Sequence, residues 1–72
     1  MLFRFGRRVE LSIYNALGQN IRTLYAGALA PGLHQVRWDG RDAGGRAVSS
    51  GTYFYRLHAG GKTHVRRLLL LR

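Results

Sequence analysis

Alternation of apolar and polar residues is the main signal in this chain, and it predicts short β-strands. In the clearest case, residues 9–14, the side chains of Val9, Leu11 and Ile13 fall on one face and polar positions fall between them. A period of two is typical of a strand with one buried face. The same stretch is rich in β-branched and aromatic residues, which favour a strand over a helix.

The same signal recurs along the chain and predicts six to seven short strands, six of which are located. They span residues 2–5, 9–14, 21–25, 33–38, 52–58 and 63–72. Ile21 and Leu24 lie three positions apart, which breaks the alternation and predicts a bulge or a twist in that strand. Residues 68–71 are all leucine and therefore apolar on both faces. We expect this run to be buried on both sides or to cover an open end of the core.

Segments rich in glycine and polar residues separate the strands and predict the turns. A turn is expected at residues 6–8, a longer loop at residues 26–32, and a positive φ at Gly18. The paired glycines at 60 and 61 predict a tight hairpin between the last two strands. Short strands at near-regular spacing, with turn signals between them, predict an all-β sandwich without helices.

One stretch, residues 38–55, is expected to organise the rest of the chain. A strand ends on a large aromatic residue, a turn rich in glycine and aspartate follows, and an aromatic strand begins after it. The residues expected to build this turn and the core beside it are Trp38, Asp39, Gly40, Asp42, Gly45, Gly51, Tyr53 and Tyr55. Val9, Leu11, Ile13 and Val36 are expected to complete the core.

Composition limits the class of protein. The 72 residues form a single small domain, residues 1–72, and a domain of this size buries only about 60% of its unfolded surface. The absence of cysteine excludes a disulfide framework and a thiolate metal site. Residues 1–5 are too few and too charged for a secretory signal peptide, and no transmembrane segment is expected. We expect either a soluble intracellular protein or one piece of a longer exported protein.

The chain is strongly basic, with a net charge of +9 from twelve basic and three acidic residues. Such a charge favours acidic partners, whether nucleic acid, anionic lipid or acidic protein. Arginines are predicted on three strands near aromatic residues, a combination that binds single-stranded nucleic acid in some proteins. The residues concerned are Arg37, Arg56, Arg66, Arg67, Tyr14, Tyr25 and Phe54. A solvated arginine-rich surface is the favoured interpretation, because charge alone supports only nonspecific binding.

No residue pattern indicates catalysis, and we expect no cofactor. Asp39 and Asp42 lie among glycines as in a calcium loop, but two carboxylates fall short of the six to eight oxygens that calcium prefers. Capping of the turn by these side chains is therefore favoured over a metal site. The three histidines, at positions 34, 58 and 64, have no spacing that brings them together, so exposed strand histidines are favoured over metal ligands.

Several motifs resemble the FlgD-like immunoglobulin-like domain family. They include Trp-Asp-Gly at residues 38–40, Gly-Thr-Tyr-Phe-Tyr at 51–55 and a basic-then-leucine tail at 66–72. The segments that share the resemblance are 9–19, 21–24, 32–40, 45–48, 50–57 and 66–72. The family includes the C-terminal sorting domains of proteins exported by the type IX secretion system. It is named for a domain of the flagellar hook-capping protein.

The resemblance implies an immunoglobulin-like, fibronectin III-like antiparallel sandwich of six to seven strands. It also implies a non-catalytic sorting or recognition domain, secreted or at the cell surface as the C-terminal part of a longer bacterial protein. Its partners would be the secretion machinery or neighbouring subunits. Family members usually carry an extra strand after an Asn-Pro-rich lead. That lead is missing here, and residues 2–5 are interpreted as the remnant of the strand.

The residues expected to carry recognition lie in the last predicted strand. They are Arg66, Arg67, Leu70, Leu71 and Arg72. If this strand lies at a sheet edge, its backbone is able to accept a strand from another chain, including a second copy. Three alternatives remain: an assembly module of an extracellular or hook-cap-like polymer, a basic nucleic-acid-binding domain, and a structural spacer beside a catalytic domain.

Overall fold

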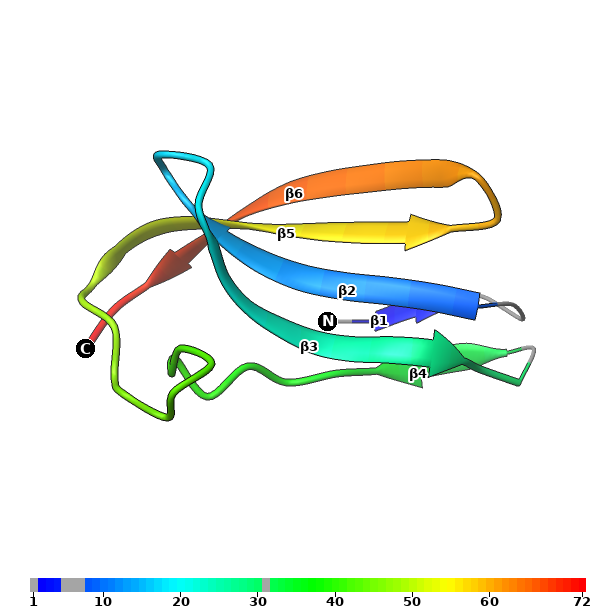
Figure 1. Cartoon of the computed structure of the whole chain (residues 1–72), viewed down its shortest axis with the longest axis horizontal. Helices are drawn as coiled ribbons and strands as arrows, with labels where there is room; N and C mark the ends of the chain where they lie inside the picture. Colours follow the sequence, from blue (N-terminus) through cyan, green and yellow to red (C-terminus); the bar gives the residue numbers. More distant parts are fainter. Residues whose placement is uncertain (1, 5–7, 31) are drawn as a thin grey trace.

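The fold consists of one four-stranded and one two-stranded antiparallel sheet (Figure 1). The computed structural model describes residues 2–4, 8–30 and 32–72. The four-stranded sheet has the order β3-β2-β5-β6 and the two-stranded sheet pairs β1 with β4. The strands are β1 (Leu2–Arg4), β2 (Arg8–Asn15), β3 (Asn20–Ala28), β4 (Leu33–Gln35), β5 (Gly51–Ala59) and β6 (Lys62–Leu70).

The all-β, antiparallel prediction is confirmed, but the predicted sandwich of six to seven strands is not. The second sheet within the described residues contains only two strands of three residues each, so it is much smaller than the four-stranded sheet. None of the described residues forms a helix with the length and apolarity needed to cross a bilayer.

The predicted strands are found, with different bounds. The strand predicted over residues 33–38 ends at Gln35, which pairs with Leu2 at the limit of the described part of β1. The prediction that a strand ends on Trp38 is therefore wrong. Ala26 to Ala28, predicted as loop, extend β3, and Arg8, predicted in a turn, begins β2. Residues 5–7 and 31 of the predicted strand, turn and loop lie outside the described residues.

The predicted irregularity near Ile21 and Leu24 is confirmed. Leu11 pairs with Tyr25 and Ser12 with Thr23, so Leu24 is left without a partner on β2. A second shift, between Ile13 and Tyr14, leaves Ile21 unpaired in the same way. Each extra residue bends and twists β3 locally. Ile21 lies at the start of β3, where the long loop after β4 bonds the strand.

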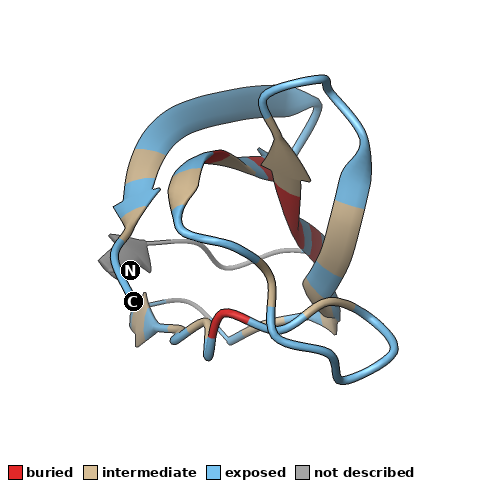
Figure 2. Cartoon of the chain, turned by 90° about the vertical axis from the view of Figure 1, so that its left-hand side faces the viewer, coloured by how far each residue is buried: buried red, intermediate tan, exposed pale blue. Residues whose placement is uncertain are grey.

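The core lies on one face of β2 and β5, as the alternation predicts. Val9, Leu11 and Ile13 are at most 2% exposed, and the register sets Leu11 directly opposite Leu57. Tyr53 and Ala59 complete the buried apolar set within the described chain. Figure 2 shows these buried segments in red on the central strands, whereas the outer strand β6 is mostly exposed and the outer strand β3 is of intermediate burial.

The aromatic residues expected in the core are buried to different extents. Tyr53 is buried, whereas Trp38 and Tyr55 are half-buried, as is Val36. Trp38 packs edge-on against Tyr53, with ring centroids 5.2 Å apart. The hydroxyl of Tyr53 donates a hydrogen bond to the carbonyl of Ser49 over 2.7 Å, the form of a tyrosine corner. These contacts join the start of β5 to the loop that precedes it.

The two predicted glycine turns are confirmed. Gly18 has a φ of 81°, and its amide donates to the carbonyl of Asn15. Gly60 and Gly61 have φ values of 58° and 77°, which a type I′ hairpin requires at both central positions. This hairpin connects β5 directly to β6 and therefore fixes the register of the last strand.

Candidate recognition site

β6 is an edge strand of the four-stranded sheet, and it carries most of the residues expected to act in recognition. Within the described chain its only strand partner is β5. Its first six residues, Lys62 to Arg67, are all exposed. The prediction that the leucine run is buried on both sides is wrong, because Leu69 is 66% exposed and Leu71 is 77% exposed. An edge strand has no second strand to cover its outward backbone.

The register divides the recognition residues between the two faces of the sheet. Arg66 lies opposite Tyr55 and so shares the core-side face, whereas Arg67 lies opposite Phe54 on the outer face. Both arginines are exposed, and neither forms an ion pair with the residues that the structure describes. Leu70 is half-buried, and its Cδ1 lies 3.5 Å from where a Cβ on Gly40 would sit. Leu69, which the prediction omitted, is more exposed than Leu70.

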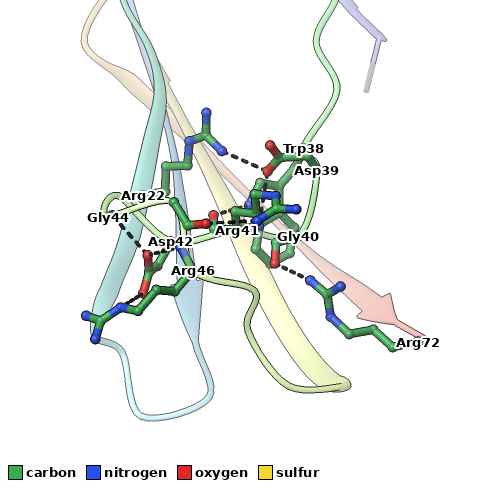
Figure 3. A network of polar contacts seen from close by, with 10 residues as sticks. Arg22, Trp38, Asp39, Gly40, Arg41, Asp42, Gly44, Arg46 and Arg72 are labelled. Atoms are coloured by element: carbon green, nitrogen blue, oxygen red, sulfur yellow. Dashed lines mark hydrogen bonds and ion pairs between the residues drawn. The ribbon is translucent and has the colours of Figure 1, made fainter.

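Arg72 differs from the other predicted recognition residues, because its polar groups bond the protein itself. Its guanidinium donates to the carbonyls of Gly40 and Val48, and its backbone amide donates to the Ser50 hydroxyl over 3.0 Å. The contact with Gly40 is drawn in Figure 3. Arg72 therefore fastens the end of β6 to the long loop between β4 and β5.

That loop is held by the two aspartates that were expected to cap it, and Figure 3 shows both. Asp39 accepts from the Arg41 amide over 3.0 Å and from the Arg22 guanidinium over 2.8 Å. Asp42 accepts from the amides of Gly44 and Arg46 over 2.9 Å and 3.0 Å. The capping prediction is therefore confirmed. No group of three or more His, Cys, Asp or Glu among the described residues is arranged to hold a metal ion.

The hydrogen bonds to Asp42 affect its acidity. The amide of Arg46 contributes most, and it lowers the pKa of the Asp42 carboxyl below the usual value of 3.8. Desolvation is the next largest effect and raises the pKa, whereas the amide of Gly44 and the charge of Arg46 lower it further. Gly45, with a φ of 82°, provides the left-handed backbone that closes this turn. The chemistry of the loop is that of a structural cap.

Two further bonds attach the loop to β3. The Arg22 side chain on β3 reaches Asp39, and the amide of Ala43 donates to the carbonyl of Ile21 over 3.1 Å. Ile21 is one of the unpaired bulge residues, so its carbonyl is available to the loop. Sequence alone gave no sign of the Arg22 contact, because the two partners are far apart in the chain.

The prediction that the three histidines are exposed on strands is confirmed for two of them. His58 and His64 are exposed on β5 and β6, as expected, whereas His34 is half-buried on β4. The Nε2 of His34 lies 2.7 Å from the carbonyl oxygen of Ala30, and the Nδ1 of His58 lies 2.8 Å from the Thr63 hydroxyl. These contacts are those of structural side chains.

The residues suggested for nucleic-acid binding are less exposed and less aligned than expected. Arg56, Arg66 and Arg67 lie on β5 and β6, but Arg37 lies beyond the end of β4, so the arginines are not spread over three strands. The aromatic residues predicted to be exposed, Tyr14, Tyr25 and Phe54, are half-buried. The Tyr25 hydroxyl donates to the carbonyl of Ala28, and the ring packs against the core.

Ser12 is the buried residue that the pattern did not predict. It lies on the face of β2 opposite to the core, yet it is only 1% exposed. Its Oγ lies 3.2 Å from the Oγ1 of Thr23 on β3, which satisfies the buried hydroxyl. Alternation alone assigns such a position to solvent, so no local signal identifies it.

Comparison with known families is consistent with this architecture. A model of the FlgD Ig-like domain family matches residues 5–62. The chain belongs to the FlgD Ig-like domain family. Members are generally non-catalytic, and the membership suggests a structural module related to flagellar hook assembly that interacts with other proteins. The comparison with curated proteins finds no match, and the comparison with solved structures finds none either.

The matched residues end where β6 begins. β6 spans Lys62 to Leu70, so almost the whole strand and the residues after it lie beyond the match. The family membership therefore rests on β2, β3, β5 and the long loop. The recognition residues of β6 have to be judged from their own geometry.

Proposed function

We propose that this FlgD Ig-like domain is a non-catalytic recognition module that binds another protein through β6. We further propose that it serves as the C-terminal sorting domain of a protein exported by type IX secretion. The observation that carries the proposal is the exposure of β6, whose first six residues are all exposed on a strand with one free edge. A free edge offers unpaired backbone groups that a partner strand is able to pair with.

The side chains of β6 indicate what kind of partner fits this edge. Lys62, Arg66 and Arg67 are basic, and the strand contains no acidic residue. Two copies of β6 placed edge to edge would bring like charges together, which is destabilising. An acidic strand from a different protein would instead pair with Arg66 and Arg67 while covering the exposed Leu69 and Leu71. The charges of β6 thus favour a heterologous partner.

The residues proposed to bind the partner differ from those predicted from the sequence. Arg66, Arg67 and Leu71 remain, and Leu69 joins them because it is equally accessible. Leu70 and Arg72 contribute to recognition indirectly, since they hold the end of β6 against Gly40 and the long loop. A deletion of residues 68–72 would remove these structural contacts together with the binding residues. Point substitutions are therefore the sharper test.

The test is export of a reporter fused to the N-terminal side of the chain, with a signal peptide, in a bacterium with type IX secretion. The variant carries Arg66→Glu and Arg67→Glu. The matched control carries Arg8→Glu and Arg37→Glu, which makes the same charge change at exposed positions away from β6. We expect the β6 variant to reach the medium or cell surface at least about tenfold less than the control, because two charge contacts are reversed. Equal export of both variants would contradict the sorting role.

An assembly module is the second candidate, favoured by the family to which the chain belongs. It requires contacts between identical or neighbouring subunits, and sedimentation of the purified chain over a concentration series distinguishes it. Association that persists at high salt supports assembly through the strand edge, whereas a monomer at every concentration supports binding to a different protein. We expect the monomer, because the basic charge of β6 repels a second copy.

A further inference from the structure

The outer face of the four-stranded sheet carries a second surface, on the side away from the Leu11 core. The register sets Tyr14 of β2 directly opposite Phe54 of β5, and Arg56 of β5 directly opposite Val65 of β6. Residues directly opposite in an antiparallel pair share one face of the sheet. We call these four residues, Tyr14, Phe54, Arg56 and Val65, the outer-face site.

The four residues surround a shallow depression of about 330 Å³. The turn between β2 and β3 closes one end of it through Asn15, Ala16 and Gly18. Val65 is 54% exposed, and the two aromatic residues are half-buried, so apolar surface lines most of the depression. An exposed apolar surface of this kind, ringed by polar groups, is typical of an interaction site.

The charge at the site is positive, and no ion pair among the described residues neutralises it. The guanidinium of Arg56 lies over the Tyr14 ring, 5.4 Å from its centroid. No residue that lines the depression is acidic. Asp39 and Asp42 cap the long loop. Glu10 shares the outer face and lies diagonally from Arg56 across β2 and β5, about 7–8 Å away.

We propose that the outer-face site binds an acidic segment of another protein in which a carboxylate adjoins an aliphatic or aromatic side chain. The carboxylate would accept hydrogen bonds from Arg56, and the apolar neighbour would pack on Val65 and Phe54. Arginine suits this role because its planar guanidinium binds a carboxylate through two bonds while resting on an aromatic ring. The net charge of +9 attracts acidic segments before contact is made.

Single-stranded nucleic acid fits the same surface less well. Binding by stacking needs aromatic rings whose faces are open to a base. Here the Tyr14 ring already lies beneath the Arg56 guanidinium, and both Tyr14 and Phe54 are half-buried. The geometry therefore favours a protein partner.

The outer-face site is distinct from the edge of β6 that carries the proposed sorting function. Arg66 lies on the core-side face, across the sheet from Arg56. A substitution at Arg56 leaves the outward backbone of β6 unchanged, and a substitution at Arg66 leaves the depression unchanged. Arg67, in contrast, lies on the outer face opposite Phe54, so single substitutions at Arg56 and Arg66 are the ones that let the two proposals fail separately.

The test is a chemical-shift titration of the isotope-labelled chain with a short peptide in which two glutamates flank a leucine and a phenylalanine. We expect the shifts to concentrate on Tyr14, Phe54, Arg56 and Val65. A peptide with glutamine in place of glutamate should bind about fivefold more weakly, because each ion pair on an exposed surface contributes modestly. Absence of shifts at these four residues, or equal binding of the two peptides, would overturn the proposal.

Variants connect the binding to the named residues. Arg56→Gln and Val65→Ser should each weaken binding of the glutamate peptide about threefold to fivefold, through the lost ion pair and the lost apolar contact. Arg66→Gln on the opposite face is the control and should change binding less than twofold. Both substituted positions are exposed, so the fold is retained. Tighter binding of oligothymidylate than of the peptide, lost in Arg56→Gln, would assign the site to nucleic acid and refute the proposed partner.

Discussion

β2 and β6 are strands of similar length in one sheet, but their burial is opposite. Val9, Leu11 and Ile13 of β2 are at most 2% exposed, whereas the first six residues of β6 are all exposed. Val65 and Leu69 of β6 are apolar and yet 54% and 66% exposed, so polarity alone does not explain the difference. β2 has a strand on each side and the core beneath it, while β6 has one neighbour among the described strands.

The comparison shows that the place of a strand in the sheet, more than its composition, decides burial. An apolar edge strand is a liability for a soluble domain, because it attracts other strands. β6 carries basic residues along its exposed part, which disfavours pairing with itself and leaves pairing with an acidic partner favourable. The central strands hold the fold together, and the edge strand is suited to recognition.

The largest expected difference in stability is between alanine substitutions of a leucine on β2 and a leucine on β6. Leu11→Ala should lower the free energy of unfolding by about 2–5 kcal/mol, because it leaves a cavity in the core. Leu69→Ala should change it by less than about 0.5 kcal/mol, because that side chain is 66% exposed. Urea denaturation followed by tryptophan fluorescence measures both. Equal losses would show that β6 is covered in solution.

Substitutions at the two neighbouring residues after β6 should also differ in their effect on the free energy of unfolding. Arg72→Ala should cost about 1–2 kcal/mol in free energy of unfolding, since it removes the bonds to the carbonyls of Gly40 and Val48. Leu71→Ala, one position earlier and 77% exposed, should cost less than about 0.5 kcal/mol. The same denaturation experiment applies. If Arg72→Ala is as stable as the wild type, the guanidinium does not fasten the loop.

A smaller difference in the free energy of unfolding is expected when a hydroxyl group is removed from β2 or from β6. Ser12→Ala should lower the free energy of unfolding by about 1 kcal/mol, because it removes the bond to Thr23 and leaves a small void. Thr63→Val on β6 keeps the shape of the side chain and removes only an exposed bond to His58, so its effect should stay within about 0.5 kcal/mol. Thermal unfolding measures the stability of both variants. A larger loss of stability for Thr63→Val than for Ser12→Ala would contradict the assignment of β2 as buried and β6 as exposed.

The pH dependence should appear in the long loop and leave β6, which contains no acidic residue, almost unchanged. The pKa of Asp42 is lowered in the folded state, so its stabilising effect is present above the usual value of 3.8 and is lost as pH falls through the lower folded value. Below pH 4 the amide signals of Gly44 and Arg46 should therefore shift, and those of β6 should not. Asp42→Asn should remove this transition. Its persistence in the variant would mean that another group titrates.

The sequence predicted local features well and long-range contacts poorly. Alternation located β2 and β5, paired glycines located the hairpin, and the broken spacing of Ile21 and Leu24 located the bulges. These features depend on residues close together in the chain. The strand that ends at Gln35 pairs with a segment far away in the chain, and local pattern does not encode that pairing.

The candidate site was predicted only in part for the same reason. The exposed arginines of β6 were identified, but Arg72 was assigned to recognition when it contacts the loop around Gly40. The burial of Ser12 and the contact of Arg22 with Asp39 likewise join strands and loops far apart in sequence. The outer-face depression arises from three strands in register, so no single segment of sequence indicates it.

Amide hydrogen exchange of the isolated chain tests most directly whether β6 has a free edge. A central strand has both edges paired, so we expect continuous protection along β2. An edge strand pairs only alternate amides, so protected and rapidly exchanging amides should alternate along β6. Continuous protection of β6 that is independent of protein concentration would contradict the account, because its outer edge would already be covered.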